Sequence, residues 1–192
     1  GSEMCKETDF HFSAEAEISI EVDPREIELD VLDHLRAEGF NRLSMGVQDF
    51  NKEVQRLVNR EQDEAFIFDL LNHAREIGFT STNIGLIYGL PKQTPENFAF
   101  TLQKVAELNP DRLSVFNYAH LPTLFAAQRK IKDADLPSAE QKLEILQETI
   151  GSLTTAGYQF IGMDHFARPD DELAVAQRCL LYTSPSPRDR TR

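Results

Sequence analysis

The sequence is short of several residues that mark particular protein classes. It has no tryptophan and only two cysteines, Cys5 and Cys179, which lie near opposite ends of the chain. Two cysteines so far apart predict neither a disulfide framework nor a metal site. No apolar run approaches the roughly 20 residues that cross a bilayer, and the N-terminus lacks the basic start and apolar stretch of a secretory signal. We therefore expect a cytoplasmic protein.

Positive charge is also scarce. The chain has 20 Lys and Arg against 32 Asp and Glu, which gives a formal net charge of -12. Nucleic acids and anionic membranes are polyanions, so they repel such a surface at long range. The composition predicts no nucleic-acid partner and no membrane partner, and favours a small molecule or another protein.

Short strand-like segments alternate with longer helix-like segments through the middle of the chain. With 192 residues, of which 41% are hydrophobic, the chain is long enough for one sizeable core. Alternation of this kind predicts an α/β fold built on a parallel sheet. The expected strands are 17–22, 42–48, 82–88, 112–118 and 158–163.

Turn and cap residues set the phase of this repeat. Thr94 can cap a helix that has Pro95 at its first position, and Ser138 with Gln141 forms a capping-box pattern. Glycine tolerates the left-handed conformation that ends many helices. The glycines expected to end helices 27–38, 66–77 and 139–156 are Gly39, Gly78 and Gly157.

Residues two apart along each expected strand share a face of the sheet. One face is apolar and should pack on helices. The other is small or polar, whereas a closed barrel usually fills its interior with bulky branched side chains. We therefore expect an interior space that admits a ligand, lined by Ser19, Ser44, Gly46, Gly85 and Ser114.

Ligands of parallel sheets lie at the carboxyl ends of the strands. Polar pairs stand at four such ends: Glu21 with Asp23, Gln48 with Asp49, Tyr118 with His120, and Asp164 with His165. Polar residues there can also be loop starts and helix caps. Their recurrence on successive strands favours a site.

Four segments carry a resemblance to a known family. They read Glu-Ile-Ser-Ile-Glu-Val-Asp-Pro, Asn-Arg-Leu-Ser-Met-Gly-Val-Gln-Asp-Phe, Leu-Ile-Tyr-Gly-Leu-Pro-Lys-Gln-Thr and Pro-Asp-Arg-Leu-Ser-Val-Phe-Asn-Tyr-Ala-His-Leu-Pro. From about residue 10 to 178 the chain resembles the oxygen-independent coproporphyrinogen III dehydrogenases (anaerobic oxidases) of the radical S-adenosylmethionine superfamily. Haem chaperone-like relatives share two of these segments but differ at 116–122.

The resemblance implies a partial TIM-like barrel of the radical S-adenosylmethionine type, of which this chain lacks the N-terminal strands. It implies S-adenosylmethionine and a [4Fe-4S] cluster as cofactors, and coproporphyrinogen III as substrate. The implied reaction is oxidative decarboxylation of two propionates to vinyl groups, which gives protoporphyrinogen IX. The intact enzyme is expected to be a monomer, and the sequence does not identify its electron donor.

The resemblance also implies site residues. Glu21 resembles a ligand of the cluster-bound S-adenosylmethionine, with a buried cap as the alternative role. Gln48, Arg60 and the backbone at Ala119 resemble ligands of a second S-adenosylmethionine. At Gly85 the family has an acidic residue, so the glycine implies a lost cofactor contact and a weakened strand.

Other family features do not occur. The Cys-x3-Cys-x2-Cys motif and a Gly-Gly-Gly-Thr-Pro segment, which belong upstream, are missing, and two cysteines cannot supply three thiolates. Residues 179–192 carry three Arg and one Asp and resemble translated adaptor sequence. We therefore expect a truncated end at 1–9, a partial barrel at 10–178, a non-native tail at 179–192, and an inactive, poorly stable protein.

Two other functions remain open. The chain could be a natural binding module that keeps contacts to S-adenosylmethionine or porphyrinogen without cluster chemistry. It could also be an unrelated barrel enzyme that uses Glu21, Asp164 or His165 for acid and base catalysis. His34 and His73 fall within expected helices and receive no role.

Overall fold

The protein folds around a six-stranded sheet with the order β1-β2-β3-β4-β6-β5. The structure, a computed structural model, describes residue 13 and residues 15–183. Predictions for residues 1–9, for Cys5 and for most of the tail therefore lie outside the described residues. The strands are β1 (Ser19–Val22), β2 (Arg42–Gln48), β3 (Ser81–Tyr88), β4 (Arg112–Asn117), β5 (Gln159–Gly162) and β6 (His165–Ala167).

The strands β1 to β4 are parallel neighbours, as the alternation predicts. The helices between and after them are α1 (Leu29–Ala37), α2 (Lys52–Leu57), α3 (Glu64–Glu76), α4 (Pro95–Leu108), α5 (Ala139–Thr155) and α6 (Glu172–Thr183), with two short 3-10 helices, η1 (Ala126–Lys130) and η2 (Asp133–Asp135). Because α6 runs through Cys179, the expected boundary at 178 is not the end of an element and stays a prediction.

The prediction of a fifth strand, at 158–163, is right in part. The strand β5 forms there, but it does not pair with β4, because the chain turns back and β6 inserts between β4 and β5, antiparallel to both. Met163 and Asp164 make the turn with φ of 48° and 68°. A turn with two positive φ values joins strands tightly, but its usual sequence signal is Asn-Gly or Asp-Gly. Met-Asp does not carry that signal, so the hairpin was missed.

The expected helix signals are confirmed. Gly39, Gly78 and Gly157 have φ near 92°, 92° and 91°, each just beyond a helix. Ser138 and Gln141 form the capping box of α5. Thr94 caps α4, which has Pro95 at its start. These local signals hold because they act within one turn of the backbone.

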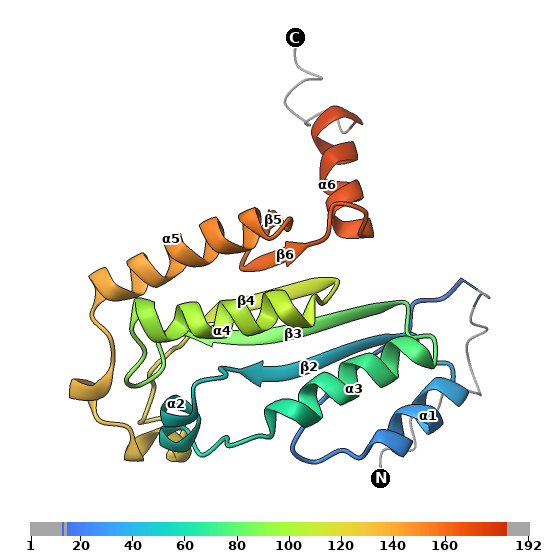
Figure 1. Cartoon of the computed structure of the whole chain (residues 1–192). Helices are drawn as coiled ribbons and strands as arrows, with labels where there is room; N and C mark the ends of the chain where they lie inside the picture. Colours follow the sequence, from blue (N-terminus) through green and yellow to red (C-terminus); the bar gives the residue numbers. More distant parts are fainter. Residues whose placement is uncertain (1–12, 14, 184–192) are drawn as a thin grey trace.

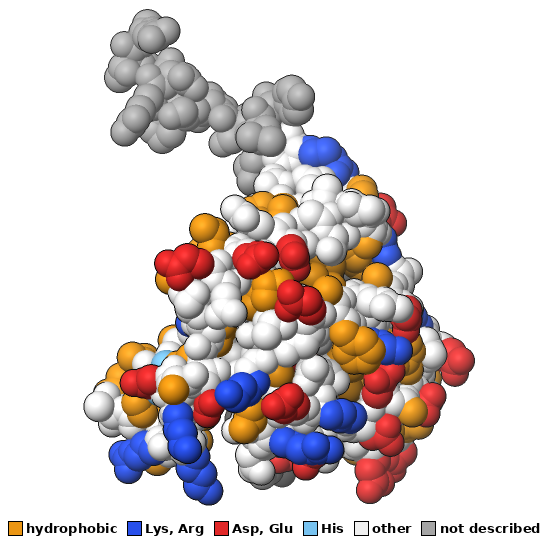
Figure 2. Space-filling view, turned by 60° about the vertical axis from the view of Figure 1, so that its left-hand side comes forward, with side chains coloured by type: hydrophobic (Ala, Val, Ile, Leu, Met, Phe, Trp, Pro, Cys, Tyr) orange, Lys and Arg blue, Asp and Glu red, His pale blue; other side chains and the backbone are white. Residues whose placement is uncertain are grey.

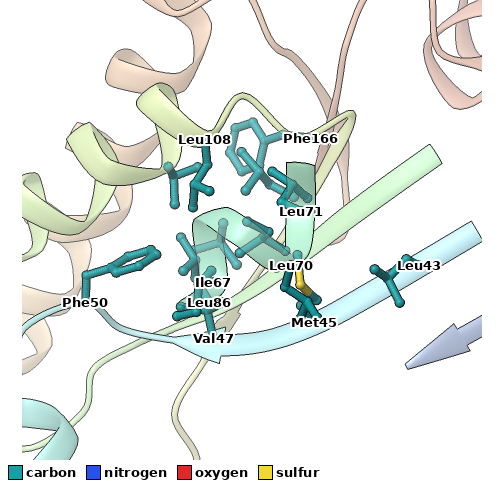
Figure 3. Close-up of a cluster of buried hydrophobic side chains, with 14 of the residues drawn as sticks. Leu43, Met45, Val47, Phe50, Ile67, Leu70, Leu71, Leu86, Leu108 and Phe166 are labelled. Carbon is teal, nitrogen blue, oxygen red and sulfur yellow. The ribbon is translucent and has the colours of Figure 1, made fainter. Parts of the chain in front are cut away.

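The apolar face of the sheet packs against α3 and α4, which Figure 1 shows in front of β2 and β3. Met45, Val47, Ile84, Leu86 and Ile67 are fully buried there. Figure 3 shows side chains of β2 and α3 pointing toward one another in this layer. Each such side chain contributes about 1.5–3 kcal/mol when it leaves water. This packing holds the opposite, inner face in place.

The inner face is small and polar, as expected. A hydrogen-bonded row crosses it: Asn83 donates to Ser44 Oγ at 2.9 Å, Ser114 donates to Asn83 Oδ1 at 3.3 Å, and Ser114 Oγ lies 3.0 Å from His165 Nδ1. A cavity of about 230 Å³ lies along this row. The expected interior space is therefore present in part: Ser19, Ser44 and Ser114 line the cavity, together with Arg42 and Arg112, whereas Gly46 and Gly85 do not.

Candidate cofactor site

Glu21, Gln48 and Arg60 come together around Gly46 at the carboxyl ends of β1 and β2. A methyl group placed on Gly46 would lie 2.9 Å from Gln48 Nε2, 3.2 Å from Arg60 Nη2 and 3.5 Å from Glu21 Oε1. Only glycine leaves this space for the three side chains. Residues far apart in the sequence thus form one cradle: Glu21 and Gln48 lie at strand ends, as predicted, and Arg60 comes from the loop after α2, where the resemblance alone pointed to it.

Arg60 is held in the cradle by its neighbours. Its Nη2 donates to the carbonyl of Gly46 at 2.8 Å and pairs with Asp23 Oδ2 at 3.1 Å. Its Nε is buried and has no hydrogen-bond partner among the described residues. An Arg fork held on one edge can pair with a ligand carboxylate on another.

Glu21 is exposed, so the alternative role as a buried cap is wrong. Its carboxylate can accept hydrogen bonds from the polar groups of a ligand. Gln48 has a positive φ of 70° and lies at a register shift in the β2–β3 ladder. This irregularity ends the pairing of β2 and turns the Gln48 side chain back toward Gly46.

Asp23 links this cradle to the loop after β1. Arg25 donates to both carboxylate oxygens of Asp23 and to the carbonyl of Asn59. The side-chain hydrogen bonds from Arg25, with smaller contributions from the Arg25 backbone and from Arg60, lower the pKa of Asp23 to about 2. Asp23 is therefore ionised at neutral pH and fixes two guanidinium groups.

Asp49 does not belong to the site. Its carboxylate is 1% exposed and accepts hydrogen bonds from Thr101 Oγ1 and Gln93 Nε2, both at 2.5 Å, and from the Asn51 amide at 2.7 Å. Burial raises the pKa of Asp49. It ties β2 to α4 and cannot reach a ligand, so the expected pair of Gln48 with Asp49 contributes only Gln48.

A cleft of about 730 Å³ opens beside the cradle. Among the described residues its lining contains four cations and no Asp or Glu, although the chain as a whole is acidic. Figure 2 brings this side of the molecule forward and shows Lys and Arg side chains over the lower half of the face, with Asp and Glu side chains among them. The lining includes Gln48, Tyr118, Arg25, Arg56, Arg60 and Lys130.

Ala119 lies at the edge of this cleft, next to Tyr118. Its carbonyl accepts a hydrogen bond from Gln128 Nε2 at 3.0 Å, and Gln128 Oε1 accepts from the Leu121 amide at 2.5 Å. Gln128 therefore holds the segment after β4 as a wall of the cleft. The expected backbone contact at Ala119 is near the cradle, although its carbonyl is already used.

Gly85 pairs with Gly46 in the β2–β3 register. A methyl group on Gly85 would meet only Met45 O at 3.7 Å and Gly46 Cα at 3.8 Å, which are ordinary contacts. A side chain can therefore start from this position without a clash at its Cβ. The expected loss of a cofactor contact is compatible with this geometry.

The hairpin divides the expected pair of Asp164 with His165: Asp164 lies in the turn directly after the carboxyl end of β5, whereas His165 begins the returning strand β6. The hairpin places His165 opposite Ser114, on the inner face, and puts Asp164 in the turn. His165 lines the smaller cavity instead of the cleft. The missed strand reversal is the cause.

The structure tests whether these residues fit the cofactors that the resemblance implies. The cradle around Gly46, with a buried guanidinium nitrogen that has no partner among the described residues, suits a polar ligand with a carboxylate. An iron-sulfur cluster does not fit. The described residues contain no group of three His, Cys, Asp or Glu side chains that could hold a metal, and Cys179 is exposed.

Sequence reasoning missed several residues of the cleft. Arg25, Arg56 and Lys130 lie on separate loops and helices, so no spacing brings them together. Arg25 alone had a signal, since it follows Asp23 in the turn after β1. Asp133 was also missed, and it pairs with His120 Nε2 at 3.1 Å.

The fold and the cradle define an α/β partial barrel that binds its ligand at the carboxyl ends of parallel strands. A family model described as the radical SAM superfamily matches residues 2–105, and the chain belongs to this superfamily. Membership implies S-adenosylmethionine and a [4Fe-4S] cluster as the cofactors of the whole enzyme.

Relatives and solved structures agree with this family. The chain is 91% identical over 169 residues to the oxygen-independent coproporphyrinogen III oxidase of Salmonella typhimurium and 90% identical to that of Escherichia coli K12. The matched region covers 88% of this chain and 37% of each relative. The structure of the Escherichia coli enzyme matches with a TM-score of 0.87 at 90% identity, over 88% of this chain and 39% of that one.

A more distant structure shares the fold alone. The Elp3 protein of Methanocaldococcus infernus matches with a TM-score of 0.57 at 16% identity, over 69% of this chain and 32% of that one. No helix among the described residues is long and apolar enough to cross a membrane.

Proposed function

We propose that this chain carries part of the cofactor and substrate site of an oxygen-independent coproporphyrinogen III oxidase. The reaction of the whole enzyme would convert two propionates of coproporphyrinogen III to vinyl groups. The observation that carries the proposal is the meeting of Glu21, Gln48 and Arg60 around Gly46 in a chain 90% identical to the Escherichia coli enzyme. Without ligands for the cluster, the chain alone is expected to be inactive.

The residues would act by binding and orientation. Glu21 accepts hydrogen bonds from one S-adenosylmethionine, while Gln48 and Arg60 hold a second, with the backbone at Ala119 beside it. Asp23 keeps Arg60 in place. The cation-lined cleft next to the cradle would take the propionates of the substrate, which are anionic at neutral pH.

A chimeric enzyme tests this proposal. Residues 10–178 would replace the matching segment of the Escherichia coli oxidase, and anaerobic conversion of coproporphyrinogen III to protoporphyrinogen IX would be measured by chromatography. We expect turnover, weaker than in the parent enzyme because of Gly85. A folded chimera with a full cluster that gives no product, with either Gly85 or Gly85→Asp, would contradict the proposal.

The same chimera tests the role assigned to position 85. Gly85→Asp adds a carboxylate at a position where a Cβ meets no clash, and a hydrogen bond to a charged group contributes about 1.5–3 kcal/mol. We expect S-adenosylmethionine to bind at least tenfold more tightly by calorimetry. Gly85→Asn is the matched control of similar size, and equal affinities of the unsubstituted chimera and its Gly85→Asp variant would refute this role.

A further inference from the structure

Tyr118, His120 and Asp133 form a hydrogen-bonded chain beside the cleft. Tyr118 Oη lies 3.2 Å from His120 Nδ1, and His120 Nε2 lies 3.1 Å from Asp133 Oδ1. The Tyr118 and His120 rings are 5.8 Å apart between centroids. Three side chains from the end of β4, the following loop and η2 are therefore linked in series.

The first member of this chain lines the cleft, and the last lies in water. Tyr118 is half-buried and is fixed by its amide, which donates to the carbonyl of Tyr88 at 2.8 Å. The His120 side chain is 14% exposed and Asp133 is 91% exposed. The arrangement thus connects a phenol in the cleft to a carboxylate at the surface.

The protons on His120 decide what the Tyr118 hydroxyl can do. When Nε2 alone carries a proton, it donates to Asp133, and the phenol donates to Nδ1. When both nitrogens carry protons, Nδ1 donates to the phenol oxygen, and the phenol proton is free to point into the cleft. Burial raises the pKa of Tyr118, so the phenol remains a donor at neutral pH.

The cleft itself selects anions. Its four lining cations, with no acidic residue among the described lining residues, favour a carboxylate. Arg25 and Arg60 are both paired to Asp23, and Arg56 to Glu61, so a neutral donor in the lining would add direction to the binding of such an oxygen. The lining also holds the neutral amides of Gln48, Asn59 and Gln128, but Tyr118 is the donor that is linked to the His120–Asp133 pair.

We infer that Tyr118 contacts a ligand carboxylate in this cleft, and that His120 and Asp133 are positioning residues which take up one proton from solvent when that carboxylate binds. Among the described residues the groups bonded to the His120 ring are the phenol of Tyr118 and the carboxylate of Asp133, and the cleft that Tyr118 lines also holds the cations Arg60 and Lys130. The inference deepens the proposed function, because the carboxylate could belong to S-adenosylmethionine or to a substrate propionate.

The test uses the full chain and two probes. Coproporphyrin III, the stable oxidised tetracarboxylate, is compared with its neutral tetra-amide by fluorescence titration, and S-adenosylmethionine is titrated separately. Tyr118→Phe removes only the hydroxyl. We expect it to weaken binding of the acid about tenfold while binding of the amide stays unchanged. If S-adenosylmethionine alone loses affinity, the carboxylate is that of the cofactor.

A second measurement tests whether His120 positions the Tyr118 hydroxyl or only supports the loop after β4. Calorimetry at pH 8 in buffers of different ionisation enthalpy reports protons taken up with the ligand, and we expect about one per bound carboxylate. His120→Gln keeps a hydrogen-bonding side chain but should abolish the uptake. The matched control is His73→Gln, which removes a His–Asp pair between α3 and α1, away from the cleft.

The outcomes are distinct from those of the chimera. Equal loss of acid and amide binding in Tyr118→Phe, proton uptake that survives His120→Gln, or a chain that binds neither acid would each overturn the inference. Turnover by the chimera together with unchanged acid selectivity in Tyr118→Phe would leave the proposed function standing and remove this role. If Tyr118→Phe loses its preference for the acid but the chimera gives no product, the role of Tyr118 stands and the proposed function fails.

Discussion

Arginines lie at both ends of the inner face of the sheet, but their surroundings differ. At the amino ends of the strands, Arg42 and Arg112 are matched by Glu17, Glu172 and Asp171, and a cavity of about 230 Å³ remains. At the carboxyl ends, four cations line a cleft of about 730 Å³ that has no acidic lining residue among those described. At the amino ends the carboxylates lie against the arginines of the cavity and close the fold, whereas at the carboxyl ends Asp23 and Glu61 pair with arginines from outside the cleft lining, which leaves the cleft itself cationic toward a ligand.

The largest expected effect is at the amino end. Asp171 is 6% exposed, accepts two hydrogen bonds from Arg112 Nε, and caps α6 through the Leu173 amide at 2.8 Å. Asp171→Ala removes a cap and leaves a mostly buried guanidinium without its partner. We expect the free energy of unfolding in urea to fall by about 3 kcal/mol.

The matched control is Asp63→Ala. Asp63 caps α3 through the Ala65 amide at 3.0 Å and has no ion pair among the residues that the structure describes. Its loss should cost about 1 kcal/mol. Equal losses in the two variants would mean that the ion pair at the amino end contributes nothing, and the contrast between the two ends would fail.

The next effect is on ligand affinity at the carboxyl end. In the chimera, Gly46→Ala places a methyl group 2.9 Å from Gln48 Nε2 and 3.2 Å from Arg60 Nη2, so both side chains must move. We expect the dissociation constant of S-adenosylmethionine to rise at least tenfold, about 1.4 kcal/mol. Gly85→Ala, one strand away with room for its methyl group, should leave affinity unchanged, and a similar loss there would refute the cradle.

These contrasts show what the sequence could and could not predict. The periodicity of the sequence predicts the four parallel strands, and the cap residues predict the helix ends, because both signals lie within a few neighbouring residues. The family resemblance predicts the cluster of Glu21, Gln48 and Arg60 through short motifs. The β5–β6 hairpin was missed because Met163 and Asp164 adopt positive φ without a turn signature. Arg25, Arg56 and Lys130 meet only through tertiary packing, which no spacing encodes.

A smaller effect concerns the pH dependence of the cleft. In the folded chain the pKa of Asp23 is lowered to about 2, against 3.8 for the free side chain. Hydrogen bonds from Arg25 cause most of this decrease, and the charge of Arg60 causes a smaller part. A depressed carboxyl pKa gives stability that is present above the unfolded value and is lost as the pH falls toward 2. We expect about 1 kcal/mol to be lost between pH 5 and pH 2.

Asp23→Asn should remove this dependence. Its urea midpoint should fall less than that of the parent chain between pH 5 and pH 2, because the amide does not titrate. The control is Asp63→Asn, which changes an exposed Asp at a helix start. A slope that is the same in Asp23→Asn and in the parent would show that other carboxylates carry the acid sensitivity.

The smallest expected effect returns to the amino end. Arg42 Nη2 contacts both Glu17 and Glu172, and these two carboxylates stand beside one another. The hydrogen bond between them lowers the pKa of Glu17 and raises that of Glu172, whose charged form is disfavoured by its neighbour. Because either carboxylate can satisfy Arg42, removing one also removes the repulsion between them.

Glu172→Gln alone should therefore leave the urea midpoint at pH 7 within error of the parent chain, and so should Glu17→Gln. The double variant should unfold at clearly lower urea, since the buried Arg42 then has no carboxylate near it. The loss of unfolding free energy in the double variant, minus the sum of the losses in the two single variants, measures how far one carboxylate can replace the other as the partner of Arg42. If the effects simply add, Arg42 depends on each carboxylate separately, and the amino end differs less from the carboxyl end, where Arg25 and Arg60 share the single carboxylate of Asp23.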